Sequence, residues 1–433
     1  MYEGGVPLKL TAPDPAADQA TLLRQRVAFV ADTTAALQRV SDPRLWRDKT
    51  LRIEFVGQPG MDWGGLTTAF LQVMADCLFD PEAPDALFAA VGADADVGGP
   101  ILDGTSEHGH QPPPVAGRRR LLPDSKLATV SEAFTGRLRL IGQLIGYMLW
   151  TGEVANLPLL PSVYAYLVGQ RPPYWRELML DDPADYKSTV QILEMPADQL
   201  EFCGFVFAYE DPADPAQELE LCPGGADIEL TAANRREWAQ LRAEMAMHGR
   251  CARGLAEIAS GFHDVVGELR DFGPFRELTE QPAELQLLLC GTATIDVADL
   301  QRQTCYKNCR MQTKECKWFF ETLASWDRGE PGWAATAEDL ADQQPGKQLV
   351  CKMVHYATGC PRSPPGGFQN MRNKANKAQP FTIKMVFDAD WKDSLPRAHT
   401  CFNRIDFGEY SSKAHLAKLL WKALLHGMNF MDA

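Results

Sequence analysis

The feature that most constrains the fold is a change in net charge and residue pattern after Cys290-Gly291, where the Leu-rich run 284–289 ends. Residues 1–294 hold 24 Lys and Arg against 42 Asp and Glu, a net charge of -18. Residues 295–433 hold 19 against 15, a net charge of +4. A chain of 433 residues is also long for a single hydrophobic core. We therefore expect at least two bodies, and their opposite charges suggest different partners.

Composition excludes several classes of protein. Hydrophobic residues make up 45% and charged residues 23%, which are the proportions of a globular protein. The overall net charge of -14 argues against broad nucleic-acid binding, which needs clustered Lys and Arg. The most apolar run, 138–150, is too short to span a bilayer, so we expect no membrane span.

The amino-terminal residues and the cysteines bear on the compartment. Residues 1–7 contain no basic end followed by an apolar stretch, so we see no signal peptide there. Eleven cysteines without regular spacing do not form the framework of a secreted disulfide protein. We expect free thiols in a reducing compartment, the cytoplasm or the nucleus.

Periodicity predicts helices and strands mixed along the chain, an α+β class. The predicted helices are 17–40, 66–79, 134–150, 160–169, 231–248 with Thr231 as N-cap, 311–324 and 411–427. The predicted strands are 51–55, 200–209, 228–230, 349–357 and 383–387. Residues 1–15 and 91–125 lack the pattern of either and are expected to be loose segments or loops.

The segment with the clearest chemical potential is Leu-Pro-Arg-Ala-His-Thr-Cys-Phe-Asn at 395–403. In an extended chain, side chains two residues apart point to the same side, which pairs His399 with Cys401. A nearby imidazole helps to hold a thiolate, and the thiolate is the reactive form of a cysteine. By itself, however, a His two residues from a Cys is more often structural than catalytic.

The whole string closely resembles the active-site segment of HECT-type ubiquitin-protein ligases. The likeness continues over residues 404–412 and covers roughly 20–433. Other segments that resemble the family's motifs are Thr358-Gly359 with Pro364 and Gly367-Phe368, 284–291, Asp62-x-Gly64-Gly65, 134–146 and Thr231 to Trp238 after Pro223-Gly224-Gly225. The resemblance implies that Cys401 accepts ubiquitin as a thioester and passes it to a substrate lysine.

The same resemblance implies a bilobal HECT fold. After a loose segment, 1–19, we expect a mainly helical N-lobe, 20–290, whose small β subdomain at about 185–260 binds the conjugating enzyme. A hinge at 291–294, with Gly291, Thr292 and Ala293, would join it to a smaller α/β C-lobe, 295–433. The implied partners are a ubiquitin-conjugating enzyme, ubiquitin and an unidentified protein substrate. The transfer exchanges one thioester for another, so no cofactor and no metal is expected.

The resemblance also assigns supporting residues. His399, Thr400 and Asn403 would shape the surroundings of Cys401, and His399, Thr400 or nearby backbone groups would supply hydrogen bonds to a developing oxyanion. Phe430 stands fourth from the end, where the family carries a bulky apolar residue, and this suggests that Ala433 is the true carboxyl terminus. The candidates for docking the conjugating enzyme are Leu193, Phe202, Phe205 and Phe207, with the core of a strand as the competing interpretation for each.

Departures from the family's pattern leave two other functions open. Gln58 stands where the family usually has Glu, Thr68-Ala69 stand where it usually has Arg-Glu, and the segment 324–346 is longer than usual. The first alternative is therefore a HECT-fold binding protein with impaired catalysis. The second is an unrelated cysteine hydrolase that uses Cys401 and a distant His.

Other candidate sites carry less weight. Cys305, Cys309 and Cys316, with Cys290 upstream, lack the two-residue spacing of common zinc sites. His108 and His110 are expected in a solvated loop, and Arg118-Arg119-Arg120 is too short for a confident phosphate site. The chain has no phosphate-binding loop that ends in Lys-Ser/Thr, no His-Glu-x-x-His and no Gly-x-Ser-x-Gly.

Overall fold

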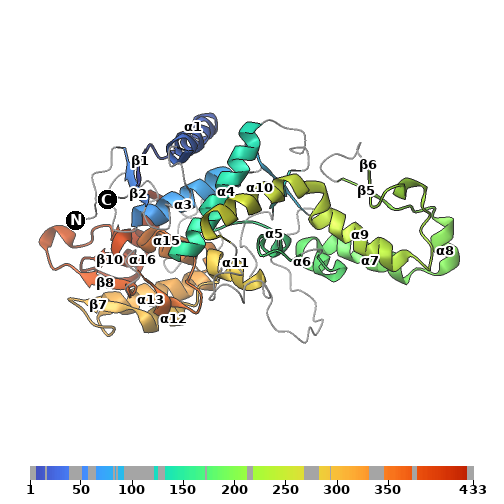
Figure 1. Ribbon diagram of the computed structural model, residues 1–433. Coiled ribbons are helices and arrows are strands. Elements are labelled where there is room, and N and C mark those ends of the chain that lie inside the picture. Colours follow the sequence, from blue (N-terminus) through green and yellow to red (C-terminus); the bar gives the residue numbers. More distant parts are fainter. Residues whose placement is uncertain are drawn as a thin grey trace. The chain divides into compact units, whose positions relative to one another are not determined.

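The computed structural model describes a mainly helical chain with four small sheets in its described part (Figure 1), in agreement with the predicted α+β class. The described residues are 6–14, 17–38, 51–56, 65–80, 83, 86–91, 121–124, 132–170, 173–211, 218–267, 282–292, 294–330, 346–372 and 378–426. None of the helices in these ranges combines the length and the hydropathy that crossing a bilayer would need.

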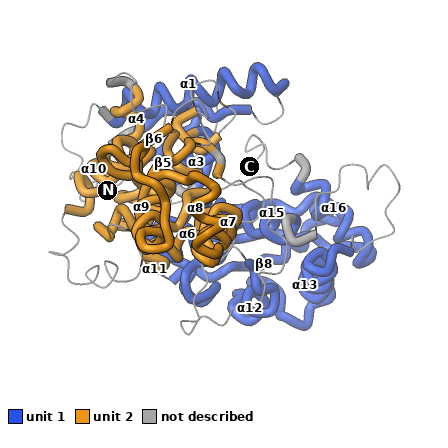
Figure 2. The backbone as a smooth tube through the Cα atoms, turned by 90° about the vertical axis from the view of Figure 1, so that its right-hand side faces the viewer, with its two compact units in different colours: residues 1–77, 151–156, 287–433 blue, residues 78–150, 157–286 orange. Residues whose placement is uncertain are grey.

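Contacts along the chain define two compact units (Figure 2). Unit 1 consists of residues 1–77, 151–156 and 287–433, and unit 2 of residues 78–150 and 157–286. Unit 1 is thus built from three separate stretches of chain. The predicted lobe and hinge boundaries remain a prediction.

The amino-terminal stretch of unit 1 pairs two short strands in parallel, β1 (Val6–Leu10) and β2 (Leu51–Phe55). The predicted loose segment 1–15 is therefore wrong at 6–10, and the predicted loop 91–125 is wrong at 121–123, which form a strand of unit 2. Side chains of β2 alternate between buried and exposed, as the sequence predicted. Helix α1 (Gln19–Gln38) and helix α3 (Gly65–Leu78) also follow the prediction. Their packing includes the rings of Phe29 and Phe70, whose centroids lie 6.2 Å apart.

The carboxyl-terminal stretch of unit 1 is organised around a four-stranded sheet in the order β7-β8-β10-β9. Its strands are β7 (Cys305–Lys307), β8 (Thr382–Met385), β9 (Arg397–His399) and β10 (Arg404–Phe407). β8 pairs in parallel with β7 and β10, and β9 is antiparallel to β10. Its helices are α12 (Val297–Gln303), α13 (Lys314–Asp327), α15 (Gly346–Thr358) and α16 (Lys413–His426).

One face of this sheet is apolar. Ile383, Met385, Ile405 and Phe407 are buried in a core that also contains Phe319 and Trp326 of α13. Residues between them on the strands, such as Lys384 and Asp406, belong to the opposite face because side chains alternate along a strand. The sheet therefore has one packed face and one polar face.

The predicted strand 349–357 is wrong, because this segment forms helix α15. Leu349, Val350, Met353, Val354 and Ala357 are all buried in the unit 1 core. Their spacing of one, three and four residues is that of a helix face. Burial of this apolar helix face stabilises α15 more than the β-propensity of its two valines favours a strand.

Unit 2 contains a pair of closely packed helices, α4 (Glu132–Thr151) and α10 (Ala252–Val266). A Cβ added at Gly142 would lie 1.9 Å from the carbonyl oxygen of Ile258, and one added at Gly261 would lie 1.9 Å from that of Arg139. Glycines therefore allow the two backbones to touch. Around this pair lie β3 (Phe88–Ala90), β4 (Leu121–Pro123) and α5 (Pro161–Leu167); α11 (Pro282–Cys290) begins in unit 2 and ends in unit 1.

The rest of unit 2 forms a second core around Leu178, Leu200, Phe207 and Trp238. Its elements are η2 (Trp175–Glu177), α6 (Leu178–Asp181), α7 (Pro183–Glu194), α8 (Ala197–Phe202), β5 (Ala208–Glu210), β6 (Glu218–Glu220), η3 (Gly225–Asp227), α9 (Arg235–Met247) and η4 (Gly249–Cys251).

Three local predictions in this region are wrong. Residues 228–230 do not form a strand, because only an isolated bridge joins Glu229 to Val206. The segment 200–209 is not one strand, because helix α8 runs to Phe202 and Gly204 then turns the chain with φ +65°. Helix α9 is not capped by Thr231. It begins after Asn234, whose side-chain Oδ1 accepts the Thr231 backbone N–H at 2.7 Å.

Candidate active site

Cys401 lies in a single turn of 3-10 helix, η9 (Thr400–Phe402), which joins β9 to β10. The chain is therefore not extended from His399 to Cys401, so the alternation that paired these two residues in the sequence analysis does not apply. The Cys401 side chain is outside the described part of the structure, but the backbone of the turn is described. Asn403 ends the turn in the left-handed conformation, with φ 47° and ψ 45°, and its N–H donates to Thr400 O at 3.1 Å. Asn tolerates this conformation better than most residues, so its type at this position has a backbone reason.

A second residue, Gln379, holds the turn from the side. Its Nε2 donates to Phe402 O at 3.0 Å, and its own carbonyl accepts from Asn403 Nδ2 at 2.8 Å. The Gln379 N–H in turn donates to Met371 O at 3.0 Å. Gln379 therefore links the thiol-bearing turn to the chain that follows η7 (Phe368–Asn370).

The polar partner of His399 is a carboxylate on the neighbouring strand. His399 Nε2 lies 3.2 Å from Asp406 Oδ2, and Arg404 Nε lies 2.8 Å from Asp406 Oδ1 in an ion pair without well-aligned hydrogen-bond geometry. Burial acts to raise the pKa of Asp406, but the hydrogen bond from His399 and the charges of His399, Arg404 and Lys384 outweigh it and leave the pKa below its usual value. The carboxylate thus stays ionised and orients the His399 ring.

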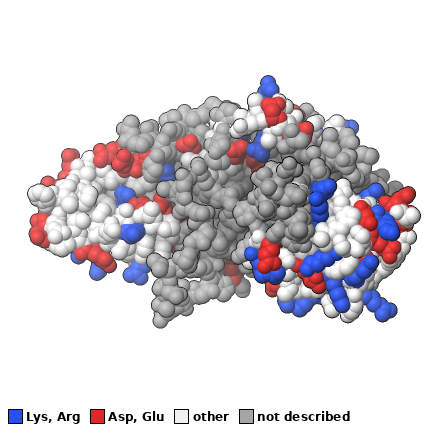
Figure 3. Space-filling model, turned by 180° about the vertical axis from the view of Figure 1, so that it is seen from behind, with Lys and Arg blue, Asp and Glu red and all other residues white. Residues whose placement is uncertain are grey.

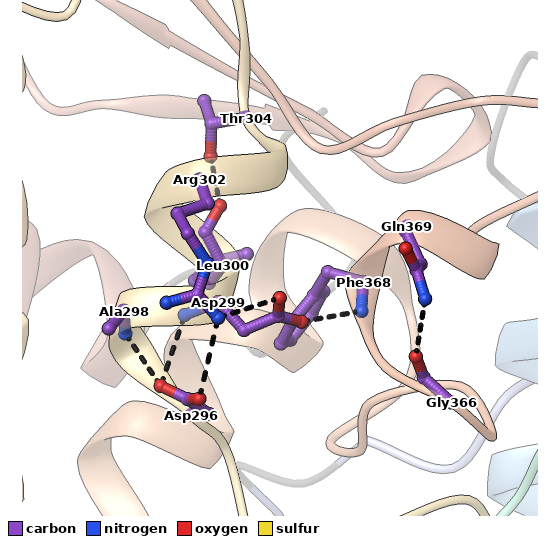
Figure 4. A network of polar contacts seen from close by, with 9 residues as sticks. All are labelled: Asp296, Ala298, Asp299, Leu300, Arg302, Thr304, Gly366, Phe368 and Gln369. Atoms are coloured by element: carbon purple, nitrogen blue, oxygen red, sulfur yellow. Dashed lines mark hydrogen bonds and ion pairs between the residues drawn. The ribbon is translucent and has the colours of Figure 1, made fainter.

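The Gly- and Pro-rich segment that resembled a family motif is fixed by α12 (Figure 4). Asp296 caps this helix by accepting the N–H groups of Ala298 and Asp299 at 2.8 and 3.0 Å. Asp299 points the other way, and its Oδ2 accepts the Phe368 N–H at 2.9 Å. Gly367 is required beside it, because its φ is +94° and an added Cβ would lie 2.7 Å from that same oxygen.

The other end of this segment contacts the predicted hinge. Thr292 and Ser363 exchange backbone hydrogen bonds, from Thr292 N–H to Ser363 O at 2.9 Å and from Ser363 N–H to Thr292 O at 3.3 Å. Gly291 has φ +61°, and an added Cβ would lie 2.3 Å from Ser363 O. Arg362, only 6% exposed, donates to Asn156 Oδ1 at 2.6 Å and to Gly291 O at 3.5 Å. Ala293 lies outside the described residues.

The four candidate docking residues differ in exposure. Phe202, at the end of α8, is 92% exposed and Phe205 is 37% exposed, whereas Phe207 is 2% exposed and belongs to the second core of unit 2. Leu193 is partly buried and packs against that core. Of the four candidates, only Phe202 and Phe205 therefore have exposed side chains.

Comparison with known proteins decides the family. The chain matches the family described as HECT-domain (ubiquitin-transferase) over residues 107–331 and 346–432. The chain belongs to the HECT family. The matched residues include the β9–β10 turn with Cys401 and most of both units. HECT-family E3 ubiquitin-protein ligases are ubiquitin transferases.

Curated relatives agree with this family. The chain is 26% identical over 381 residues to the E3 ubiquitin-protein ligase TOM1-like of Neurospora crassa, covering 88% of this chain and 8% of that protein. It is 25% identical to the E3 ubiquitin-protein ligase pub3 of Schizosaccharomyces pombe and to Nedd-4 of Drosophila melanogaster, over 96% and 94% of this chain and 45% and 35% of those proteins. The chain thus spans less than half of the length of each of these relatives.

The remaining candidates of this HECT chain fall in different places. Phe430, Gln58, His108, His110 and the arginines 118–120 lie outside the described residues, as does the side chain of Thr68, while Ala69 is buried in α3. Cys290 and Cys316 are buried, and burial raises the pKa of the Cys316 and Cys309 thiols. In the described part of the chain, no three His, Cys, Asp or Glu side chains are grouped as a metal site.

Gln379 and Asp406 are the residues of this site that the sequence analysis missed. Asp406 could have been predicted from the sequence, because Arg404 and Asp406 are two residues apart in a strand and share a face with His399. No sequence pattern indicated Gln379, because it lies 22 residues before Cys401 in an irregular segment.

Proposed function

We propose that this chain is a HECT-type ubiquitin-protein ligase that carries ubiquitin as a thioester on Cys401. The observation that carries the proposal is the family match over 346–432, which contains Cys401 in the turn between two paired strands. The implied partners are a ubiquitin-conjugating enzyme, ubiquitin and a protein substrate.

The chemistry needs two acyl transfers. The Cys401 thiolate attacks the thioester carbonyl of the charged conjugating enzyme, whose own thiolate leaves. A substrate lysine amine then attacks the new thioester, Cys401 leaves as a thiolate, and an amide bond forms with loss of a proton from the amine. The first step exchanges one thioester for another, so it is nearly balanced in free energy and no cofactor is assigned to it.

Supporting roles follow from position. His399 lies directly before the turn and is oriented by Asp406, which suits it to stabilise a thiolate or to accept a proton from the amine. Thr400 and nearby backbone N–H groups are candidates to stabilise the oxyanion. Asn403 stabilises the turn. Phe430 helps to present the carboxyl-terminal tail during transfer of ubiquitin to the substrate.

The lobes and the docking site complete the proposal. We assign residues 20–290 to the N-lobe, with conjugating-enzyme docking at about 185–260, residues 291–294 to the hinge and 295–433 to the C-lobe. The exposure of Phe202 and Phe205 supports docking there, because a partner gains most from burying large apolar side chains. A hinge would let the Cys401 thiol approach the thioester on the conjugating enzyme.

The test is a single discharge assay with conjugating enzymes charged with ubiquitin. Wild type should acquire a ubiquitin adduct that reducing agent removes, and Cys401→Ala should not. Cys305→Ala is the matched control, because Cys305 is an exposed free thiol on the same sheet, and it should load normally. A HECT-fold binding protein without activity would give no adduct with any conjugating enzyme. An unrelated hydrolase would cleave ubiquitin esters without one.

A further inference from the structure

The polar face of the unit 1 sheet carries a row of charges that crosses all four strands. Backbone register places Arg397 of β9 opposite Asp406 of β10, Asp406 beside Lys384 of β8, and Lys384 beside Lys307 of β7. Because side chains alternate along each strand, these four residues lie on the face opposite the apolar core. We call Arg397, Asp406, Lys384 and Lys307 the transverse row.

The row has three cations and one anion, and the anion is already engaged. Asp406 is 3% exposed and lies against His399 and Arg404. Among the described residues, no carboxylate forms a close ion pair with Lys307, Lys384 or Arg397, although the charge of Lys384 acts on Asp406 from a distance and helps to lower its pKa. Arg397 instead stacks over the Trp391 ring, 4.5 Å from its centroid, and remains exposed.

Like charges placed opposite each other on neighbouring strands repel. Lys307 and Lys384 are such a pair, with Lys307 exposed and Lys384 partly exposed. An incoming carboxylate would offset this repulsion. The wider setting has the same sign, since residues 295–433 carry +4 in a chain of net charge -14. Figure 3 shows many Lys and Arg, with Asp and Glu among them, at the lower right of the view from behind, which is the side on which α12 and α13 lie.

The row starts next to the thiol-bearing turn. His399 and Arg404 flank η9 and pair with each other across the strands, and the row lies two residues further along them. Two residues of strand span about 7 Å, and three strand spacings from β9 to β7 span about 14 Å. An extended peptide advances about 3.3 Å per residue. A peptide with its lysine at the turn would therefore reach Lys384 and Lys307 with residues about two to five positions away.

We propose that the transverse row binds the acidic flank of the substrate, so that this ligase prefers lysines with Asp or Glu about two to five residues away. This inference rests on the proposed function, because it names the substrate class of the same site. The three cations of the row act on the acceptor side of the second transfer and have no role in loading, whereas Asp406 orients His399. Arg397 and Lys384 hold the near acids, and Lys307 holds the far one.

The test uses two peptides of equal length, each with one lysine, flanked by Glu and Gly in one and by Gln and Gly in the other. Wild-type thioester is isolated and mixed with each peptide in a single turnover. We expect faster discharge to the Glu peptide at low ionic strength, with the advantage shrinking as salt screens exposed charges. Lys307→Glu and Lys384→Glu should each cut the advantage roughly two- to fivefold, the range for exposed ion pairs.

The matched control is Lys422→Glu on α16, an exposed lysine outside the sheet, which should keep the full advantage. Thermal unfolding of each variant checks that it folds. Equal discharge of the wild type to both peptides overturns the inference. So does an equal loss with Lys422→Glu, or a matching loss in loading, which would assign the row to the conjugating enzyme.

A binding arm separates this inference from the proposed function. The unloaded protein is titrated with each peptide while backbone amide signals are followed by NMR. The Glu peptide should shift signals of 305–307 and 382–385, and the Gln peptide should not. If no thioester ever forms, the proposed function fails, yet this arm still decides whether the row takes acidic peptides. Absence of shifts with the Glu peptide overturns the inference by itself.

Discussion

At the scale of single residues, the Asp406 carboxylate is a buried charge that three basic side chains stabilise. Its pKa is lowered because His399, Arg404 and Lys384 outweigh the effect of burial. A carboxylate with a lowered folded-state pKa contributes stability above its unfolded-state pKa of about 4, and loses it as pH falls through the folded-state value.

Asp406→Asn should lower the free energy of unfolding at pH 7 by about 1.5–3 kcal/mol, the range for hydrogen bonds to a charged group. The difference from wild type should shrink as pH falls below about 4, because the carboxylate is protonated there first in the unfolded state and only at a lower pH in the folded state. Urea unfolding at pH 7, 5 and 3 measures it. A difference that stays constant across this range would show that the ionised carboxylate is not responsible.

Gln379 offers a prediction about the turn rather than the core. Gln379→Glu keeps the size of the side chain but replaces the N–H donor to Phe402 O with an oxygen that repels it. Loss of one neutral hydrogen bond is worth about 0.5–1.5 kcal/mol, so loading of Cys401 should slow roughly two- to tenfold. The rate of adduct formation measures this.

The control for Gln379 is Gln369→Glu. The Gln369 side chain makes the same kind of bond, from Nε2 to Gly366 O at 3.2 Å, but it joins η7 to the loop before it rather than to the turn with Cys401. This variant should load at the wild-type rate. Equal slowing in both would indicate a general effect of added negative charge on the sheet region.

At the scale of elements, the two helices α4 and α10 approach so closely that their glycines cannot be replaced without movement. In Gly142→Ala the new Cβ would meet the Ile258 carbonyl, so the helices must separate and unfolding free energy should fall by at least about 2 kcal/mol. Gly136→Ala on the same helix has nothing within 4 Å and should gain up to about 1 kcal/mol from helix propensity. Relative to wild type, the unfolding temperature should fall for Gly142→Ala and rise for Gly136→Ala.

Long periodic elements could be predicted from the sequence, and short ones depended on contacts that the sequence does not display. Helices α1 and α4 have 20 residues each and helix α13 has 14, so their apolar patterns are long enough to be recognised in the sequence. Helix α15 also had this spacing, but its valines favoured a strand in a short window. At 200–209 the turn at Gly204 separated Phe205 from the helix before it, and a short apolar run does not reveal such a turn.

The candidate site shows the same division. The motif around Cys401 could be recognised from the sequence because its residues are consecutive. The family that it indicated is confirmed. The contacts that hold the string come from Gln379, 22 residues before it, and from Asp406 across a strand pair. A single sequence contains no record of which distant residue donates to Phe402 O.

At the scale of the whole molecule, unit 1 is assembled from stretches that are far apart in the sequence. Arg362 joins two of them, because its guanidinium donates to Asn156 in the short stretch 151–156 and to Gly291 O. Ala155 adds a backbone hydrogen bond to Leu289 O at 3.1 Å. The predicted hinge is therefore held at Gly291 and Thr292, and any swing must break these bonds or use residues beyond them.

Arg362→Ala should destabilise unit 1 and leave unit 2 unchanged. It leaves Asn156 Oδ1 without its donor and removes charged hydrogen bonds worth about 1.5–3 kcal/mol. Native-state hydrogen exchange should therefore become faster for peptides covering 287–292 and 359–368, and should stay at the wild-type rate for α10. Arg328→Ala is the control, because Arg328 pairs with Glu330 on the surface of the same unit and should change neither. Faster exchange in α10 as well would mean that the two units unfold together, and the bonds of Arg362 would then stabilise the whole chain rather than the hinge alone.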